Sequence, residues 1–134
     1  MKQLIIATLL AGAVSSLAHA DSNALLQQYA QQGASTPSAQ RGQAMWQQTF
    51  AGSGEFSERS CASCHTSDLS RAGKHVKTGK DIQPMSPLVN AERLSDERKV
   101  EKWLLRNCKW TLGRECSIQE KADFLAYIKD AEAI

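Results

Sequence analysis

The sequence predicts an all-α domain with a looped middle region. Apolar residues recur at the helical spacing, most clearly at Val100, Trp103 and Leu104. A second apolar stripe, with Phe124 and Ile128, lies close to the C-terminus. No run of alternating apolar and polar residues predicts a strand. Glycine and proline are concentrated in the middle of the chain, which indicates loops there.

The first twenty residues have the pattern of a cleaved signal peptide. Lys2 supplies the positive start, residues 4–17 are mostly apolar, and Ala18-His19-Ala20 is a small-x-small cleavage site. The apolar stretch is too short for a membrane anchor. We therefore expect cleavage after Ala20 and export of a soluble chain that does not insert into the membrane.

Two segments follow the signal peptide. Residues 21–37 are predicted to form a short helix and a linker, because Leu25 and Tyr29 share a helical face and Gly33 to Pro37 has the composition of a loop. The remaining residues, 38–134, are predicted to form the folded domain.

Three helices are expected in that domain. Ser38 can cap one that runs towards Phe50 and ends at the glycine-rich residues 51–54. Another is expected to begin at Ser95 and to end near Asn107 and Cys108. The last helix follows the capping-box pattern Ser117-Ile118-Gln119-Glu120.

The most specific motif is Cys61-Ala62-Ser63-Cys64-His65. Two thiols at this spacing can each add to one vinyl group of a single porphyrin, and the next residue can bind the iron through its imidazole. A redox Cys-x-x-Cys pair is the alternative, but no βαβ pattern surrounds the motif. The motif predicts one covalent haem c, with Cys61 and Cys64 as thioethers and His65 as the proximal iron ligand. Haem attachment and disulfide formation both occur outside the cytoplasm, so the exported chain is expected in the bacterial periplasm.

Few side chains can bind the other face of the iron. Met45 lies on the helix before the motif and is interpreted as part of the core. His75 lies in a basic loop and is interpreted as a solvated residue. Met85, in Pro84-Met85-Ser86-Pro87, resembles the methionine ligand of electron-transfer cytochromes, but it comes only twenty residues after His65. Packing of Met85 against the haem is the alternative.

The order of helix, Cys-x-x-Cys-His motif, loops, helix and terminal helix resembles the class I cytochrome c fold. In that fold the first and last helices cross through small and aromatic residues. The resemblance implies that four residues lie at this crossing: Gly42, Trp46, Phe124 and Tyr127.

Residues 38–129 also resemble the sphaeroides haem protein (SHP) group of monohaem cytochromes. The resemblance rests on residues 77–80, 84–87, 106–110, 113–116 and 120–123. It implies that Asn107 binds the ferric iron and that a Cys108–Cys116 disulfide lies beside it. Without the resemblance Met85 ranks first, and spacing makes Asn107 only one candidate. An Asn that caps the end of a helix is the alternative role of Asn107.

A neutral amide oxygen is a hard, weak donor, which suits Fe(III) better than Fe(II). We therefore expect that Asn107 leaves the iron on reduction, so that O₂, NO or CO can bind. The resemblance also implies that the protein accepts electrons from a dihaem cytochrome c. A simple electron carrier with permanent His65 and Met85 ligands is the alternative. An enzyme such as a peroxidase or NO dioxygenase is a further alternative. Peroxide cleavage would need a distal acid–base group, for which His75 is not well placed, and Arg106 and Arg114 are nearby in sequence and could assist.

Cys108 and Cys116 are an even pair in an oxidising compartment, which independently favours a disulfide. It either only stabilises the fold or also holds Asn107 over the iron.

The net charge of +2 gives no indication of nucleic-acid binding. A basic run, Arg71, Lys74, Lys77 and Lys80, precedes Asp81. This run either docks an acidic redox partner or is a solvated loop whose charge offsets the haem propionates.

Overall fold

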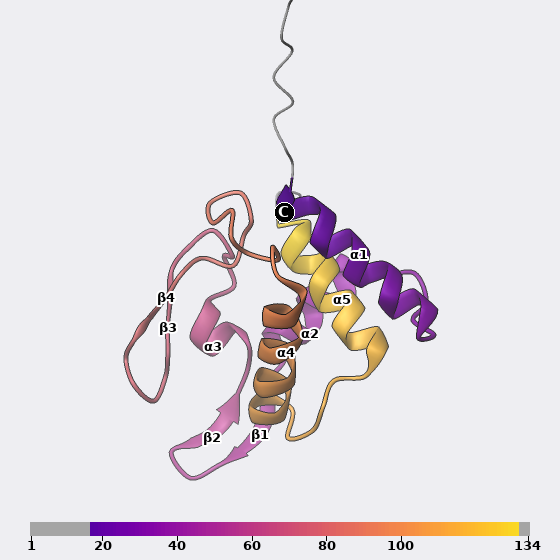
Figure 1. The fold of residues 1–134 in the computed structure, drawn as a ribbon. Helices are drawn as coiled ribbons and strands as arrows, with labels where there is room; N and C mark the ends of the chain where they lie inside the picture. Colours follow the sequence, from indigo (N-terminus) through magenta and orange to yellow (C-terminus); the bar gives the residue numbers. More distant parts are fainter. Residues whose placement is uncertain (1–16, 132–134) are drawn as a thin grey trace, which may run out of the picture.

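A computed structural model describes residues 17–131 of the chain. Within that range the chain forms five helices and two antiparallel two-stranded sheets (Figure 1). The helices are α1 (Leu17–Gln31), α2 (Ala39–Gln47), α3 (Ala62–His65), α4 (Glu97–Thr111) and α5 (Ile118–Lys129). The strands are β1 (Phe50–Ser53), paired with β2 (Phe56–Arg59), and β3 (Gly73–Lys74), paired with β4 (Asp81–Ile82). The predicted all-α class is confirmed, but the two short hairpins were not predicted.

The crossing of α2 and α5 forms the centre of the core. A Cβ added to Gly42 would lie 2.1 Å from the Asp123 carbonyl oxygen and 2.8 Å from the Tyr127 Cβ, so the helices approach as closely as glycine permits. The Trp46 ring packs edge-on against Phe124 and Tyr127, with centroids 6.3 and 5.7 Å away. Burying each of these aromatic side chains contributes about 2–3 kcal/mol. The four residues expected at the crossing are therefore confirmed there.

Asp123 fastens the start of α2 to α5. Its carboxylate accepts hydrogen bonds from the Ser38 backbone N–H (2.8 Å), the Gln119 amide (3.0 Å) and both Arg41 Nε and Nη2 (2.8 Å each). Burial raises the pKa of Asp123, but these hydrogen bonds and the Arg41 charge outweigh burial, so the pKa lies below its usual value. An ionised Asp123 is therefore part of the native crossing.

Two of the predicted helix starts are confirmed. The Ser38 hydroxyl accepts from the Arg41 N–H at the start of α2, and Ser117 and Glu120 form a complete capping box at the start of α5. The predicted end of α2 near Phe50 was wrong, because the helix ends at Gln47 and Phe50 begins β1.

The predicted bounds of α4 were also wrong. Asp96, rather than Ser95, caps its start by accepting from the Lys99 N–H. The helix continues past Cys108 to Thr111, and the chain turns at Gly113, whose positive φ of 75° suits glycine.

Helix α1 covers the outer side of α5 (Figure 1). Leu25 and Tyr29 are 2% and 1% exposed and belong to the same core as the other helices. The Tyr29 hydroxyl donates to Glu101 of α4, and burial together with this hydrogen bond raises its pKa well above the usual value. The predicted signal peptide lies outside the described residues except for Leu17 to Ala20, which belong to α1. No helix in residues 17–131 is long and apolar enough to cross a membrane.

Candidate haem site

The Cys-x-x-Cys-His motif forms the single turn of α3. The backbone N–H groups of Cys64 and His65 both donate to the Cys61 carbonyl, at 3.3 and 3.1 Å. A separation of three positions on one helical turn places the two cysteines on the same face. Both thiols are free and partly buried, and burial raises the pKa of Cys61 to about 12. The turn therefore presents two unpaired thiols, as thioether attachment to one porphyrin requires.

His65 has the features of an imidazole prepared for a metal. Burial, together with the nearby charges of Arg93 and His75, lowers its pKa to about 4. The imidazole is therefore neutral at pH 7, which is the form that binds metals. Its Nδ1 is buried and has no hydrogen-bond partner within residues 17–131. Such an atom is rare in a packed interior. The neutral imidazole and the two free thiols fit a covalently bound haem.

The backbone turns sharply directly after His65. Thr66 adopts φ 64° and ψ 169°, a region that costs a non-glycine residue about 1–3 kcal/mol and is typical of functional sites. The Trp46 indole Nε1 donates to the Thr66 carbonyl at 2.8 Å and holds this turn.

Strand β3 also packs against the backbone of the motif. A Cβ added to Gly73 would lie 2.0 Å from the Cys64 carbonyl oxygen and 2.9 Å from the His65 Cα. Only glycine fits so close a contact. The sequence indicated Gly73 merely as a loop residue, because no local pattern predicts a long-range contact of this kind.

Asn107 lies inside α4 rather than at its end. The helix continues to Thr111, and its C-cap is Leu112, whose N–H donates to the Cys108 carbonyl. The alternative role of Asn107 as a helix cap was therefore wrong. Its side chain is exposed and has no hydrogen-bond partner in the described part of the chain. An exposed amide without a partner is available to bind another group.

The other candidate ligands have different surroundings. Met85 is partly buried against the core, and its backbone N–H donates to the Leu69 carbonyl at 2.9 Å. Met45 also packs against the core, as expected. His75 is exposed, and its Nδ1 accepts hydrogen bonds from the backbone N–H groups of Lys77 and Thr78, both at 3.3 Å.

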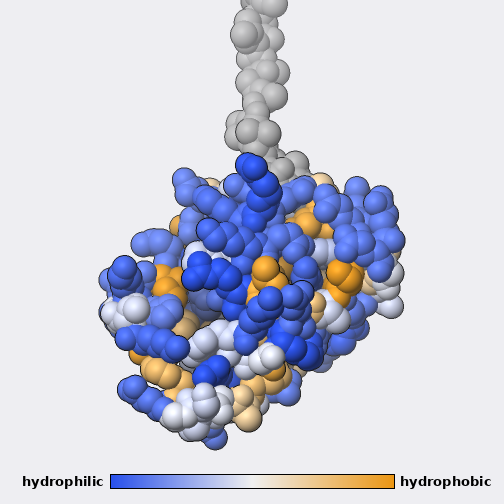
Figure 2. All heavy atoms as spheres, turned by 60° about the horizontal axis from the view of Figure 1, so that its bottom comes forward, coloured by the Kyte–Doolittle hydropathy of each residue, from blue (hydrophilic) through white to orange (hydrophobic). Residues whose placement is uncertain are grey.

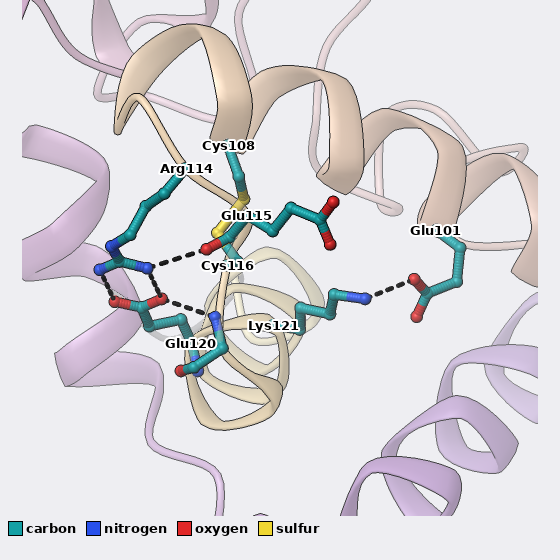
Figure 3. Close-up of a disulfide and its surroundings, with 8 residues drawn as sticks. Glu101, Cys108, Arg114, Glu115, Cys116, Glu120 and Lys121 are labelled. Carbon is teal, nitrogen blue, oxygen red and sulfur yellow. Dashed lines mark hydrogen bonds and ion pairs between the residues drawn. A yellow bond between two sulfur atoms is a disulfide. The ribbon is translucent and has the colours of Figure 1, made fainter.

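The Cys108–Cys116 disulfide is present and joins α4 to the start of α5 (Figure 3). The two Cα atoms are 5.6 Å apart, and the cysteines are 3% and 7% exposed. Arg114 binds both carboxylate oxygens of Glu120 within the same turn, at 2.7 and 2.8 Å (Figure 3). The Arg114 hydrogen bonds lower the pKa of Glu120. The residue before Cys108 is Asn107, so the disulfide restrains the backbone next to it.

Both arginines that could assist an enzymatic reaction are engaged in other contacts. The Arg114 guanidinium is bound to Glu120, and that of Arg106 lies over the Trp103 ring, 5.1 Å from its centroid.

The helical fold and the Cys-x-x-Cys-His turn define a class I c-type cytochrome with one covalent haem. The chain belongs to the SHP family of monohaem cytochromes. It is 44% identical over 90 residues to the cytochrome c-type protein SHP of Cereibacter sphaeroides, covering 67% of this chain and 68% of that protein. The family model described as a domain of unknown function (DUF1924) matches residues 32–128.

Solved structures agree with this assignment. The structure of oxidised SHP, described as an oxygen-binding cytochrome c, superposes with a TM-score of 0.75 at 38% identity, over 81% of this chain and 96% of that chain. The solution structure of cytochrome c'' from Methylophilus methylotrophus, reported with insights into haem-ligand detachment, gives a TM-score of 0.69 at 36% identity, over 81% and 92% of the two chains.

Proposed function

We propose that this protein is a periplasmic cytochrome that accepts electrons and, on reduction, releases Asn107 from the iron so that a diatomic molecule such as O₂, NO or CO can bind. Cys61 and Cys64 would hold the haem as thioethers, and His65 would bind one face of its iron. The haem, when bound, supplies an iron whose preference for hard or soft ligands changes with its oxidation state. Periplasmic location is inferred from the expected signal peptide and the disulfide.

The observation that carries this proposal is the state of the Asn107 side chain. Asn107 lies within α4 rather than at its end, and its side chain is exposed to solvent. This side chain has no hydrogen-bond partner within residues 17–131. An amide oxygen is a weak donor to iron. Because the side chain has no other partner, Asn107 can leave the iron without breaking other contacts of the fold. The oxygen binding described for SHP and the ligand detachment described for cytochrome c'' support the same behaviour in this relative.

Met85 is the competing ligand, and a permanent thioether would make the protein a simple electron carrier. Its partial burial against the core is consistent with packing beside the haem as well as with ligation. The two residues therefore provide a matched pair of variants, Asn107→Ala and Met85→Leu.

The test is the visible and electron paramagnetic resonance spectra of the purified holoprotein, oxidised and anaerobically reduced, with and without CO. We expect a ferrous spectrum that changes at once with CO. Asn107→Ala should change the ferric spectrum, whereas Met85→Leu should leave its ligand signature intact. A ferrous protein indifferent to CO, with a ferric spectrum altered only by Met85→Leu, would overturn the proposal in favour of the electron carrier.

We further propose that the electron donor is an acidic redox protein, with a dihaem cytochrome c as the expected class. The cations of the loop at residues 71–80 are partly engaged, because Lys74 pairs with Asp81 at 2.7 Å and Lys77 lies 5.5 Å from the Phe56 ring centroid. The solvent side of α4 carries five exposed cations: Arg98, Lys99, Lys102, Arg106 and Lys109. Arg106 lies over the Trp103 ring and Lys109 pairs with Glu115, which leaves the other three without an ion pair in the described part of the chain.

The carboxylates of α4 do not offset this basic surface. Glu97 accepts a hydrogen bond from Gln28, and Glu101 pairs with Lys121 at 2.7 Å on the inner side of the helix. Figure 2 shows one largely hydrophilic face of the molecule with small, separate hydrophobic patches. Exposed cations such as those of α4 can steer an acidic partner into a transient redox complex.

A further inference from the structure

One side chain, that of Arg59, joins the haem-attachment segment to α4. Arg59 is the last residue of β2. Its Nη1 donates to the Trp110 carbonyl at 2.8 Å, and its guanidinium carbon lies 4.8 Å from the centroid of the Trp110 ring. Trp110 is in the last turn of α4, where carbonyl groups have no partner within the helix. Arg59 therefore caps the C-terminal end of α4 from outside the helix.

The rest of the β1–β2 hairpin holds Arg59 in place. The Arg59 Nε donates to the Phe56 carbonyl at 3.1 Å, and the Phe56 ring packs edge-on against Trp110, with centroids 6.3 Å apart. Gly52 leaves room for the arginine, because a Cβ there would lie 2.5 Å from the Arg59 Nε. The guanidinium is thus fixed by a strand, a ring and a helix end together.

The contact joins two short stretches of chain next to the haem site. Arg59 is two residues before Cys61, and Trp110 is three residues, or about one helical turn, after Asn107. Rigid secondary structure lies on both sides, since β2 leads into the α3 turn and α4 contains both Asn107 and Trp110. Arg59 therefore connects the segment just before the thioether cysteines to the helix that carries Asn107.

We propose that Arg59 is a positioning residue, which holds the C-terminal part of α4, and with it Asn107, at a fixed place relative to the haem-attachment turn. The inference rests on the proposed role of Asn107 as the ligand that leaves. Arginine suits the task because its planar guanidinium makes two directed hydrogen bonds while stacking on the indole, and a lysine cannot make the same set of contacts. Without Arg59, α4 would move more freely and Asn107 would occupy the iron for less of the time.

The test compares ferric holoprotein variants by the high-spin fraction in electron paramagnetic resonance and by azide affinity. Azide competes with Asn107, so weaker holding of α4 should raise its apparent affinity. We expect Arg59→Met to raise azide affinity about tenfold and to increase the high-spin fraction, with Arg59→Lys in between. Trp110→Leu keeps the backbone carbonyl but removes the ring, and should change both readouts in the same direction even if Arg59→Met does not fold.

Arg41→Met is the matched control. It also removes an arginine with several hydrogen bonds, those to Asp123 and Thr36, but it lies at the α2–α5 crossing. It should lower stability without changing azide affinity. Unchanged azide affinity in both Arg59→Met and Trp110→Leu, together with an altered Asn107→Ala spectrum, would overturn this inference alone. An unaltered Asn107→Ala spectrum would overturn the proposed function and this inference together.

Discussion

The indole of Trp46 and the imidazole of His65 lie with their ring centroids 5.5 Å apart and their planes tilted by 46°. The same indole donates through Nε1 to the carbonyl of Thr66, the next residue along the chain. One side chain of α2 therefore contacts both the ring of the proximal histidine and the strained backbone that follows it. Trp46 also packs against Phe124 and Tyr127 of α5, so the helix crossing supports the haem turn directly.

Replacing Trp46 by phenylalanine should weaken the proximal side. The variant keeps an aromatic ring but leaves the Thr66 carbonyl without its donor, which should lower the free energy of unfolding by about 1–2 kcal/mol. Resonance Raman spectroscopy of the ferrous holoprotein should show an altered iron–histidine stretch. Tyr29→Phe is the control, because it removes a partly buried hydrogen bond to Glu101, far from the motif in sequence, and should leave the iron–histidine stretch unchanged. An unchanged stretch in Trp46→Phe would show that the indole does not orient His65.

Removing the disulfide should have two separable effects. Cys108→Ser with Cys116→Ser opens a short loop, and chain entropy predicts a loss of about 2.5 kcal/mol in the free energy of unfolding. If the disulfide also holds Asn107, the ferric spectrum should shift towards high spin. Glu115→Gln is the control, since it removes only the exposed ion pair with Lys109, worth less than about 1 kcal/mol. A loss of stability with an unchanged ferric spectrum would mean that the disulfide only stabilises the fold.

Asp123 should make stability depend on pH on the acid side. Its folded pKa lies below its usual value, so its contribution is complete above the unfolded pKa of about 4 and is lost as the pH falls through the folded pKa. Asp123→Asn should lower the free energy of unfolding at pH 7 by about 2–3 kcal/mol, and the difference from the native protein should narrow in acid. Urea unfolding of the holoprotein at several pH values measures this.

Asp81→Asn provides the comparison for the acid titration. The Asp81 side chain is 75% exposed in its ion pair with Lys74, so its replacement should change stability by less than about 1 kcal/mol. A difference between Asp123→Asn and the native protein that stays constant from neutral to acid pH would contradict the assigned role of the ionised carboxylate.

The basic surface of α4 should govern the approach of an acidic electron donor. Lys99→Glu with Lys102→Glu and Arg71→Glu with Lys80→Glu change the net charge equally, on α4 and on the loop respectively. With an acidic ferredoxin as the probe, stopped-flow reduction at low salt should slow about tenfold or more in the α4 variant and less in the loop variant. The dependence of the reduction rate on salt should also weaken more in the α4 variant than in the loop variant. Equal slowing in both variants would mean that only the net charge matters.

Local patterns in the sequence predicted the helices well and their ends less well. The Ser117–Glu120 capping box is a local signal, and α5 begins where it predicts. The α4 helix continues past the predicted end because neither Asn107 nor Cys108 stops a helix, and the turn comes only at Gly113. The β3–β4 hairpin was missed because its strands have two residues each, too few for an alternating pattern. The strands of the β1–β2 hairpin have four residues each, but β1 includes Gly52 and lies in the stretch that the sequence indicated as a break after the helix.

The haem motif and the disulfide depend on residue types that few other roles require, so the sequence was enough to predict both. The contacts that surround them were not predictable in the same way. Arg59 and Trp110 are 51 residues apart, and the Trp46 Nε1 reaches a carbonyl 20 residues away. Such contacts depend on how the helices pack, which no short window of the sequence contains.

The close packing of Gly73 on the Cys64 carbonyl has a consequence for biogenesis. Strand β3 follows the motif in the chain, so synthesis and export expose Cys61 and Cys64 before the strand that later covers their turn. In the folded chain both thiols are partly buried. We therefore expect the thioether bonds to form before β3 packs against the motif.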